Sequence, residues 1–290
     1  MTDRYKRISE ASGVELRYAA LIRAYEFTPL VERAVACLRQ QTLAPEKIII
    51  VDSSKRLDTR RAFERLAESV VVYPDEEFNF SKAINVGVEA NDLPWTLIFS
   101  SHVLLKSPDI IETGWKAAVE RGIDVVSWEG FPIEILEAGS NIGDELIEID
   151  SKKFNGRNGF SNCAGLVATK LLEARPFREE VFSAEDQEWA RFYLEKFNQP
   201  ILKMQSSRFE YLNPNASGSS WELKTINEVL AIGHYVNRRL IWPDRVLARY
   251  LRALLAMVRL RKDRAQLHFS FATEMLLANF RPPNRRSRYF

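Results

Sequence analysis

Two adjacent carboxylates, Glu185 and Asp186, lie near the start of a helical pattern that extends from Ser183 to about Phe197. A carboxylate in such a position can act as a general base that removes a proton from a hydroxyl group. A structural role also fits, because Ser183 followed by Asp186 has capping-box spacing and acids in a first helical turn are favoured by the helix dipole. On these residues alone, both interpretations of Asp186 stay open.

Polar residues also follow three apolar runs, at Arg23 to Glu26, Asp52 to Ser54 and Ser100 to His102. Ligands on open parallel sheets bind beyond the carboxyl ends of the strands, so these residues are candidates for a binding site. Asp52 can accept hydrogen bonds from a nucleotide base or ribose, whereas Asp-Ser-Ser is also good turn and N-cap chemistry. Without further context, the turn is the better interpretation.

Lys82 and Asn85 lie in a second helical pattern, which begins at Ser81. A cation and an amide near a helix N-terminus can hold phosphate oxygens. A solvated helix face explains the same residues and, without context, is the more common case.

These residues need a sheet whose strand ends meet at one edge. From Tyr18 to about Trp128, short aliphatic or β-branched runs alternate with amphipathic stretches such as 29–40, which indicates a parallel sheet covered by helices. The runs are continuous and apolar, as is typical of strands buried on both faces. The expected strands are 18–23, 47–51, 70–73, 95–99 and 124–128.

The second half of the chain is predicted to be less regular. Residues 130–160 are rich in Gly, Asn and Lys, which favours a mobile active-site loop over a linker, and the apolar run CAGLVAT follows. Two or three helices are expected between Trp221 and Phe280, with a break near Trp242-Pro243.

Three segments together resemble the family 2 glycosyltransferases of the GT-A fold. They are LIRAYEFTPLVERAVACLRQQTLAPEKIIIVDSS, NFSKAINVG at 79–87 and AEDQEWA at 184–190, and the resemblance covers roughly residues 18 to 235. The family's opening reads like (I/V)-(R/P)-T-Y-N, then Q-T, then I-I-V-V-D-D-G-S, where this chain has IRAYE, QQT and IIIVDSS. The resemblance implies an α/β fold with a mostly parallel central sheet flanked by helices. We expect a GT-A-like domain over 1–235 and a C-terminal helical extension with a basic tail over 236–290.

The resemblance also implies roles for the polar residues. Asp186 would be the base that deprotonates the acceptor hydroxyl as its oxygen attacks the anomeric carbon opposite the departing nucleotide, which inverts the configuration. Glu185 and Trp189 would lie on the acceptor side, although Trp189 is better suited to the core. The donor would contact Arg23, Tyr25, Glu26, Asp52 and Ser53 through its base and ribose, and Lys82 and Asn85 through its diphosphate.

The chain departs from the family pattern at the end of the fourth strand. Where the family carries Asp-x-Asp for ribose and a divalent ion, this chain has Ser100-Ser101-His102. Imidazole is a competent ligand for manganese or zinc and a poor one for magnesium, so His102 could hold a cation together with His234 in GHYVNRR. Alternatively, histidine could donate a hydrogen bond to the leaving phosphates, with Lys82 or Arg238 supplying charge in place of a metal.

Composition is that of a globular protein of one or two domains, with 290 residues and a net charge of only +2. There is no global field for nucleic acid. The polar start MTDRYKRISEASG is not a secretory signal, no uncharged apolar run approaches the roughly 20 residues of a membrane span, and Cys37 and Cys163 show no metal-type spacing. We therefore expect a cytoplasmic protein. Peripheral association with the inner membrane face is compatible with this location.

An apolar stripe near the C-terminus has arginines on its flanks. This pattern suits a partner helix or an anionic membrane surface, whereas packing on the chain's own catalytic domain or across a homodimer is the more common case. The stripe is Leu247, Tyr250, Leu251, Leu254, Leu255 and Val258, and the arginines are Arg245, Arg249, Arg252 and Arg259.

The sequence therefore predicts an inverting glycosyltransferase of hexosyl or deoxyhexosyl type. Its donor would be a nucleotide-diphosphate sugar and its acceptor a glycan or lipid-linked glycan in a bacterial surface polysaccharide such as capsule, O-antigen or exopolysaccharide. The main alternative is a non-catalytic nucleotide-sugar-binding or assembly subunit, suggested by the missing Asp-x-Asp. A sugar-phosphate nucleotidyltransferase is disfavoured because IRAYEFTP lacks the glycines of a phosphate loop.

Overall fold

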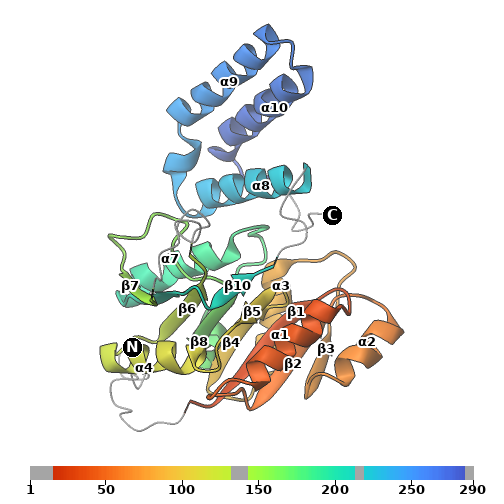
Figure 1. The fold of residues 1–290 in the computed structure, drawn as a ribbon. Coiled ribbons are helices and arrows are strands. Elements are labelled where there is room, and N and C mark those ends of the chain that lie inside the picture. The colour runs from red at the N-terminus through yellow and green to blue at the C-terminus, as the bar shows by residue number, and fades with distance from the viewer. Residues whose placement is uncertain (1–15, 132–142, 213–218, 285–290) are drawn as a thin grey trace.

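The computed structural model describes residues 16–131, 143–212 and 219–284 (Figure 1). The polar start of the chain, part of the predicted active-site loop and residues 285–290 of the basic tail lie outside the described residues. Within these ranges, no helix combines the length and the apolar composition that crossing a bilayer requires.

The predicted parallel strands are present, and four of them form one half of a central sheet. The apolar runs are buried because helices cover the sheet, as expected for parallel strands, except in the edge strand at 69–72, which is partly exposed. The sheet order is β3-β2-β1-β4-β8-β6-β9-β7. The parallel strands on this side are β1 (Tyr18–Ala24), β2 (Lys47–Asp52), β3 (Ser69–Val72) and β4 (Trp95–Ser100), and the connecting helices are α1 (Pro29–Arg39), α2 (Leu57–Glu64) and α3 (Phe80–Glu89).

The other half of the sheet is mixed. β8 (Ala164–Ala168), which is the predicted run CAGLVAT, inserts antiparallel between β4 and β6 (Val125–Glu129). β6 then pairs in parallel with β9 (Ile201–Gln205). Four of the seven strand pairs are parallel, so the sheet is mostly parallel as predicted.

A strand lies inside the segment that the sequence predicted to be a loop. β7 (Glu145–Ile149) pairs antiparallel with β9 at the edge of the sheet, so the prediction of irregular structure over 130–160 was wrong for these residues. The segment ELIEI is mostly exposed or half-buried, with only Ile149 buried, which suits an edge strand. A separate ribbon joins β5 (Val103–Leu105) to β10 (Phe209–Tyr211), and α4 (Ile110–Arg121) packs beside β6.

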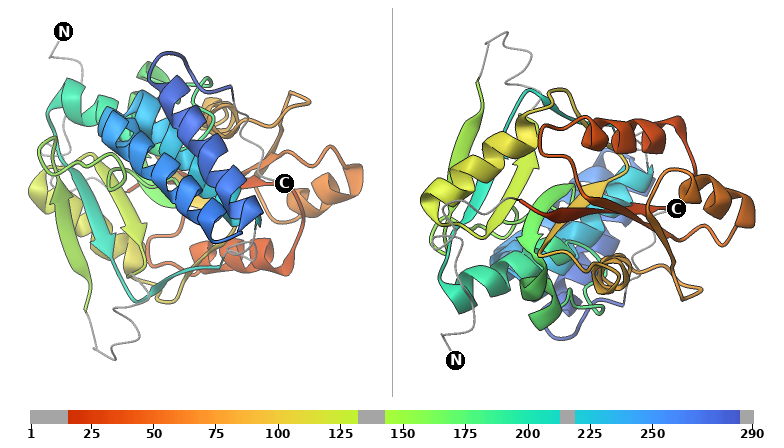
Figure 2. Two further views of the ribbon diagram at one scale, coloured as in Figure 1. Left: turned by 90° about the horizontal axis from the view of Figure 1, so that it is seen from above. Right: turned by 90° about the horizontal axis from the view of Figure 1, so that it is seen from below.

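The C-terminal helices form a layer of their own above the sheet (Figure 1). α8 lies nearest the α/β part, and α9 and α10 form an outermost hairpin, which crosses nearest the viewer in the left view of Figure 2. A second hydrophobic cluster joins Ile226 and Leu230 of α8 to Phe271 and Met275 of α10. The same cluster includes Phe182 of the α/β part, so α8 packs against both parts, and the boundary after residue 235 stays a prediction. The remaining helices are α6 (Thr169–Ala174), α7 (Glu185–Phe197), α8 (Ser219–Tyr235), η2 (Arg238–Ile241), α9 (Pro243–Val258) and α10 (Lys262–Ala278).

Candidate active site

The parallel register brings the ends of three strands to one place. Arg23, near the end of β1, pairs with Val51 of β2 on one side and with Ser100 of β4 on the other. Its guanidinium lies over the ring of Phe80 at 5.1 Å from the centroid and is mostly buried. Tyr25 and Glu26 follow β1 and are exposed, so they are accessible at this edge of the sheet.

Asp52 is fully buried at the end of β2 and is held by its own chain. One carboxylate oxygen accepts a hydrogen bond from the Ser54 amide at 2.8 Å, and the other lies 3.4 Å from Arg60 Nε. Ser53 donates from both its amide and its hydroxyl to the Ala24 carbonyl oxygen. The contacts of Asp52 are thus those of the turn interpretation, and its role toward a nucleotide stays a prediction.

The start of α7 differs from the predicted capping box. Its N-cap is Ala184, in the left-handed conformation with φ 55°, and no side chain caps the helix. The helix therefore begins after Ser183, and Asp186 accepts hydrogen bonds from the Gln187 amide at 2.8 Å and the Asn162 amide at 3.3 Å. The capping box predicted for Ser183 and Asp186 is therefore absent, whereas Asp186 does lie in the first turn of α7, where the helix dipole favours an acid. The role of Asp186 as a base stays a prediction.

Glu185 and Asp186 share their partner Asn162, in the loop before β8. The Asn162 side-chain amide donates to Glu185 Oε1 at 2.6 Å, and Arg23 Nη1 lies 3.5 Å from the same oxygen. Glu185 is buried, whereas Asp186 is partly exposed. One asparagine therefore links the two carboxylates, and Arg23 joins the pair to the strand ends.

Burial raises the pKa of both carboxyl groups. For Glu185 the pKa rises to about 7, first because the charged form is desolvated and then because Asp186 lies beside it, while Arg23 opposes the shift. For Asp186 the pKa is also raised by burial, and the amides of Asn162 and Gln187 oppose the shift. Both carboxyl groups therefore bind a proton more readily than an exposed carboxyl group does, and the two groups titrate as a pair.

His102 lies just beyond β4 with a neutral ring. Its pKa is lowered by burial and then by the nearby charges of Lys224 and Arg23. The ring packs edge-on against Tyr211, and among the described residues no group hydrogen-bonds its buried Nδ1 atom. Lys224 comes from α8, so the helical layer reaches the strand-end site.

The structure gives other predicted residues packing roles. The Asn85 side chain donates to the Phe177 carbonyl oxygen and accepts from the Phe177 amide, which uses both ends of its amide group. Lys82 pairs with Asp75 at 2.5 Å. Both side chains contact other protein groups. These contacts give no support to the diphosphate-binding role that the sequence predicted for them.

His234 and Trp189 are also accounted for by packing. Nδ1 of His234, at the end of α8, lies 2.7 Å from the Ala278 carbonyl oxygen of α10. Trp189 is fully buried, stacks on Tyr193 and donates from Nε1 to the Arg175 carbonyl oxygen, which is the core role that the sequence favoured. The contacts of Trp189 are those of a core residue, and the contact of His234 uses one of its two ring nitrogens, so the role of His234 as a metal ligand stays a prediction.

Two site residues were not found from the sequence. Asn162 lies in a polar loop and Lys224 in the middle of a helix, and neither position carries a local motif. Their contribution arises from contacts with residues far away in the chain. The signal available was only that Asn162 stands next to the apolar run CAGLVAT, a place where a strand begins.

The donor set for a metal ion is limited. Within the described parts of the chain, no group of three or more His, Cys, Asp or Glu side chains is arranged to hold a metal. The unpartnered Nδ1 of His102 suits manganese or zinc in kind, because imidazole nitrogen is a good ligand for both. A cation at this place would need further ligands from a bound diphosphate.

Comparison with solved structures identifies the fold. The chain is similar to the mannosyltransferase PcManGT from Pyrobaculum calidifontis in complex with GDP-Man and Mn2+, with a TM-score of 0.58, 13% identity and coverage of 92% of this chain and 88% of that chain. It is also similar to glucosyl-3-phosphoglycerate synthase from Mycobacterium tuberculosis in complex with Mn2+, UDP and phosphoglyceric acid, with a TM-score of 0.53, 13% identity and coverage of 78% and 81%.

A third similar structure is TarS of S. aureus, with a TM-score of 0.52, 14% identity and coverage of 88% of this chain and 90% of that chain. No protein-family model and no curated protein sequence matches the chain. The architecture is that of the GT-A glycosyltransferase fold, as the resemblance predicted.

Proposed function

We propose that this chain is an inverting glycosyltransferase that transfers a hexosyl group from a nucleotide-diphosphate sugar to a hydroxyl of a glycan or lipid-linked glycan. The observation that carries the proposal is the Glu185–Asp186 pair, linked by Asn162 and joined through Arg23 to the strand ends. The GT-A fold adds support, because ligands on such sheets bind at the carboxyl ends of the strands. Two of the similar structures are named as a mannosyltransferase and a glucosyl synthase, which favours a hexosyl group.

In the proposed reaction, Asp186 takes the proton of the acceptor hydroxyl. The acceptor oxygen then forms a bond to the anomeric carbon while the bond from that carbon to the diphosphate oxygen breaks, with both electrons leaving on the diphosphate. One base and one leaving group suffice, and attack opposite the leaving group inverts the anomeric configuration. Glu185 accepts a hydrogen bond from Asn162 and lies near Arg23, and with its pKa raised to about 7 it is the member of the pair that we propose to hold a shared proton.

The leaving diphosphate needs positive charge. Arg23 and Lys224 both act on His102, so this edge of the sheet offers two cations beside a neutral imidazole. Two of the similar structures contain Mn2+. Where a divalent cation binds here, His102 would hold it through Nδ1, and the cation would neutralise charge on the diphosphate.

We further propose that the product belongs to a bacterial surface polysaccharide. This proposal rests on the family resemblance of the sequence and not on a contact in the described site.

Replacing Asp186 tests the proposal most directly. Nucleoside diphosphates and their sugars are first screened for binding by calorimetry, with and without manganese, and turnover of the selected donor is measured as release of nucleoside diphosphate. Asp186→Asn should keep donor binding but lower turnover by about 10²- to 10⁴-fold, because it removes the base and keeps the shape. Asp58→Asn, at an exposed acid of α2, is the matched control.

Two outcomes would contradict this proposal. Wild-type turnover in Asp186→Asn would exclude Asp186 as the base. Nucleotide binding with no turnover of any donor would favour the non-catalytic alternative.

Loss of manganese-dependent binding in His102→Ala, with metal-free binding retained, would identify His102 as the protein ligand of the manganese ion.

A further inference from the structure

The outermost helix α9 has three distinct faces. Small residues on one face, among them Val246, Ala253 and Ala256, are buried in the helical layer. A second face is apolar and exposed, with spacing of three and four residues that places its members on one side of the helix. This face consists of Leu247, Leu251, Leu254, Leu255 and Val258, whose exposed fractions range from 49% for Leu255 to 80% for Val258. The stripe predicted from the sequence is thus turned away from the rest of the chain, except for the partly buried Tyr250.

The exposed apolar surface continues onto α10. Tyr250, next to Leu254 on the helical wheel, packs edge-on against Phe269 of α10 with ring centroids 5.4 Å apart. The Tyr250 hydroxyl also lies 3.1 Å from Thr273 Oγ1, one turn further along α10. Because these contacts lie on the side of the hairpin that carries Leu254, both helices contribute to one apolar face. Its members on and just after α10 are Phe269, Leu276, Leu277 and Phe280, all exposed.

A row of arginines forms the third face of α9. Arg245, Arg252 and Arg259 are exposed and follow one another at intervals of seven residues, which keeps them on one side of the helix. Arg249 is different, because its guanidinium lies 4.7 Å from the centroid of the Phe271 ring and belongs to the packing between α9 and α10. The row therefore borders the apolar face without interrupting it.

The helical extension is strongly basic as a whole. Residues 236–290 contain thirteen Lys or Arg and three Asp or Glu, a net charge of +10 in a chain whose total is +2. Two copies of such a surface would bring like charges together, which opposes a homodimer through this face. An anionic surface would attract it, and an apolar face beside arginines matches an interfacial helix.

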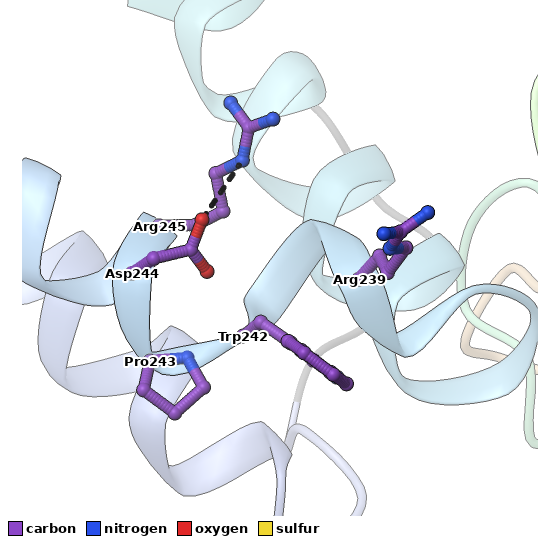
Figure 3. A pocket seen from close by; sticks show the side chains of 5 residues that line it. All are labelled: Arg239, Trp242, Pro243, Asp244 and Arg245. Carbon is purple, nitrogen blue, oxygen red and sulfur yellow. Dashed lines mark ion pairs between the residues drawn. The ribbon is translucent and has the colours of Figure 1, made fainter.

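The start of α9 adds an aromatic anchor. Trp242 is 53% exposed and lines an open hollow with Arg239, Pro243, Asp244 and Arg245 (Figure 3). Arg245 Nε lies 3.8 Å from Asp244 Oδ2, which is a long contact between two exposed side chains. Tryptophan beside basic side chains is the combination found at the level of lipid head groups.

We propose that the exposed face of the α9–α10 hairpin is a docking surface for an anionic lipid bilayer. The apolar side chains of both helices enter the interface, Trp242 lies at the level of the head groups, and the arginine row contacts lipid phosphates. This docking does not depend on the proposed sugar transfer, because it uses no residue of the strand-end site.

Vesicle binding tests this proposal with the full chain and without any sugar donor. We expect binding to vesicles of phosphatidylcholine with phosphatidylglycerol that is at least about tenfold tighter than to phosphatidylcholine alone, and that weakens as salt is raised. Leu251→Asn with Leu255→Asn should weaken binding to the anionic vesicles at least about tenfold. Arg252→Gln with Arg259→Gln should remove most of the preference for anionic lipid.

Matched controls come from α2, which has exposed residues of the same kinds. Leu57→Asn, and Arg61→Gln with Arg65→Gln, should bind vesicles as the wild type does. All altered side chains are exposed, so circular dichroism and thermal unfolding should stay unchanged. Equal binding to both vesicle types would overturn the proposal. A concentration-dependent dimer that is lost in the leucine variant, with no vesicle binding, would assign the face to a second copy instead.

Discussion

At the scale of single residues, the site depends on how two neighbouring carboxylates are made different. Glu185 is buried, and its side chain accepts from the Asn162 side chain and lies near Arg23, whereas Asp186 is partly exposed and accepts from the backbone amides of Asn162 and Gln187. Two acids in one place cannot both ionise easily, and the more deeply buried Glu185 has its pKa raised to about 7. The same difference makes stability depend on pH.

We expect the free energy of unfolding to fall as pH rises from about 4.5 to about 7. The pKa of Glu185 is raised in the folded protein from 4.5 to about 7, so the folded state binds more protons than the unfolded state in this window. The stabilisation is complete below the unfolded pKa and is lost as pH rises through the folded one. Glu185→Gln should remove this dependence, which amounts to on the order of 2–3 kcal/mol.

Urea unfolding of both proteins at a series of pH values measures this effect. Glu64→Gln, at an exposed position of α2, serves as the matched control. A variant Glu185→Gln whose stability falls with pH as steeply as that of the wild type would contradict the assignment of the proton to Glu185.

At the scale of elements, α3 packs closely on β1 and β2, the strands whose ends contribute to the candidate site. Gly87 faces β1 and β2, and a Cβ atom built there would lie 2.1 Å from Leu21 Cδ1 and 2.9 Å from Val51 Cγ2. No other residue type allows this approach without movement. The same helix carries Asn85, which holds the Phe177 backbone and so fixes the segment that leads to α7.

Gly87→Ala should destabilise the protein by about 1–3 kcal/mol, because overpacking a tight contact forces side chains or backbone to shift. The higher helix propensity of alanine offsets part of this cost. Gly143→Ala is the control, since a Cβ atom there meets nothing within 4 Å. Denaturant unfolding measures the free energy of unfolding of both variants. Equal values for the two variants would show that α3 can move away from the sheet at no cost.

At the scale of the whole molecule, hydrogen bonds at the end of α8 connect the helical layer to the α/β part. Arg191 of α7 donates to the Val236 carbonyl oxygen at 2.8 Å, Tyr235 donates to the Glu180 carbonyl oxygen at 3.0 Å, and Asn237 donates to the Asn155 carbonyl oxygen at 3.0 Å. All three join the end of α8 to segments beside α7. This junction keeps α8, with Lys224, above the strand ends.

Arg191→Met should lower the free energy of unfolding by about 1 kcal/mol. The substitution keeps an apolar stem but removes the cation at the end of α8 and leaves the Val236 carbonyl without this donor. The side chain is partly exposed, so solvent compensates part of the loss. Thermal unfolding of this variant is compared with that of Arg61→Met on α2, which should differ from the wild type by less than about 0.5 kcal/mol. Indistinguishable melting of the two variants would show that the junction does not depend on Arg191.

Much of the fold was accessible from local patterns. Buried parallel strands are continuous apolar runs, so β1, β2, β3, β4 and β6 could be predicted, and the polar residues at their ends followed from the geometry of a parallel sheet. The break at Trp242-Pro243 and the amphipathic character of α9 are likewise local properties. The position of the Glu185–Asp186 pair at the start of a helix was also a local property, whereas its expected role came from the family resemblance.

Long-range contacts set the remaining features, which local periodicity does not encode. β7 is a strand only because β9 supplies its hydrogen bonds, and Asn162 and Lys224 reach the site only because distant segments pack together. Burial distinguishes the environments of Glu185 and Asp186, and the hydrogen bonds of Asn85 to Phe177 and of His234 to Ala278 join segments that are distant in the chain. The apolar stripe on α9 could be recognised as a pattern in the sequence. Whether it faces the core or the solvent depends on which side of α9 is covered by α10. That is decided by packing between two helices and is not a property of one segment.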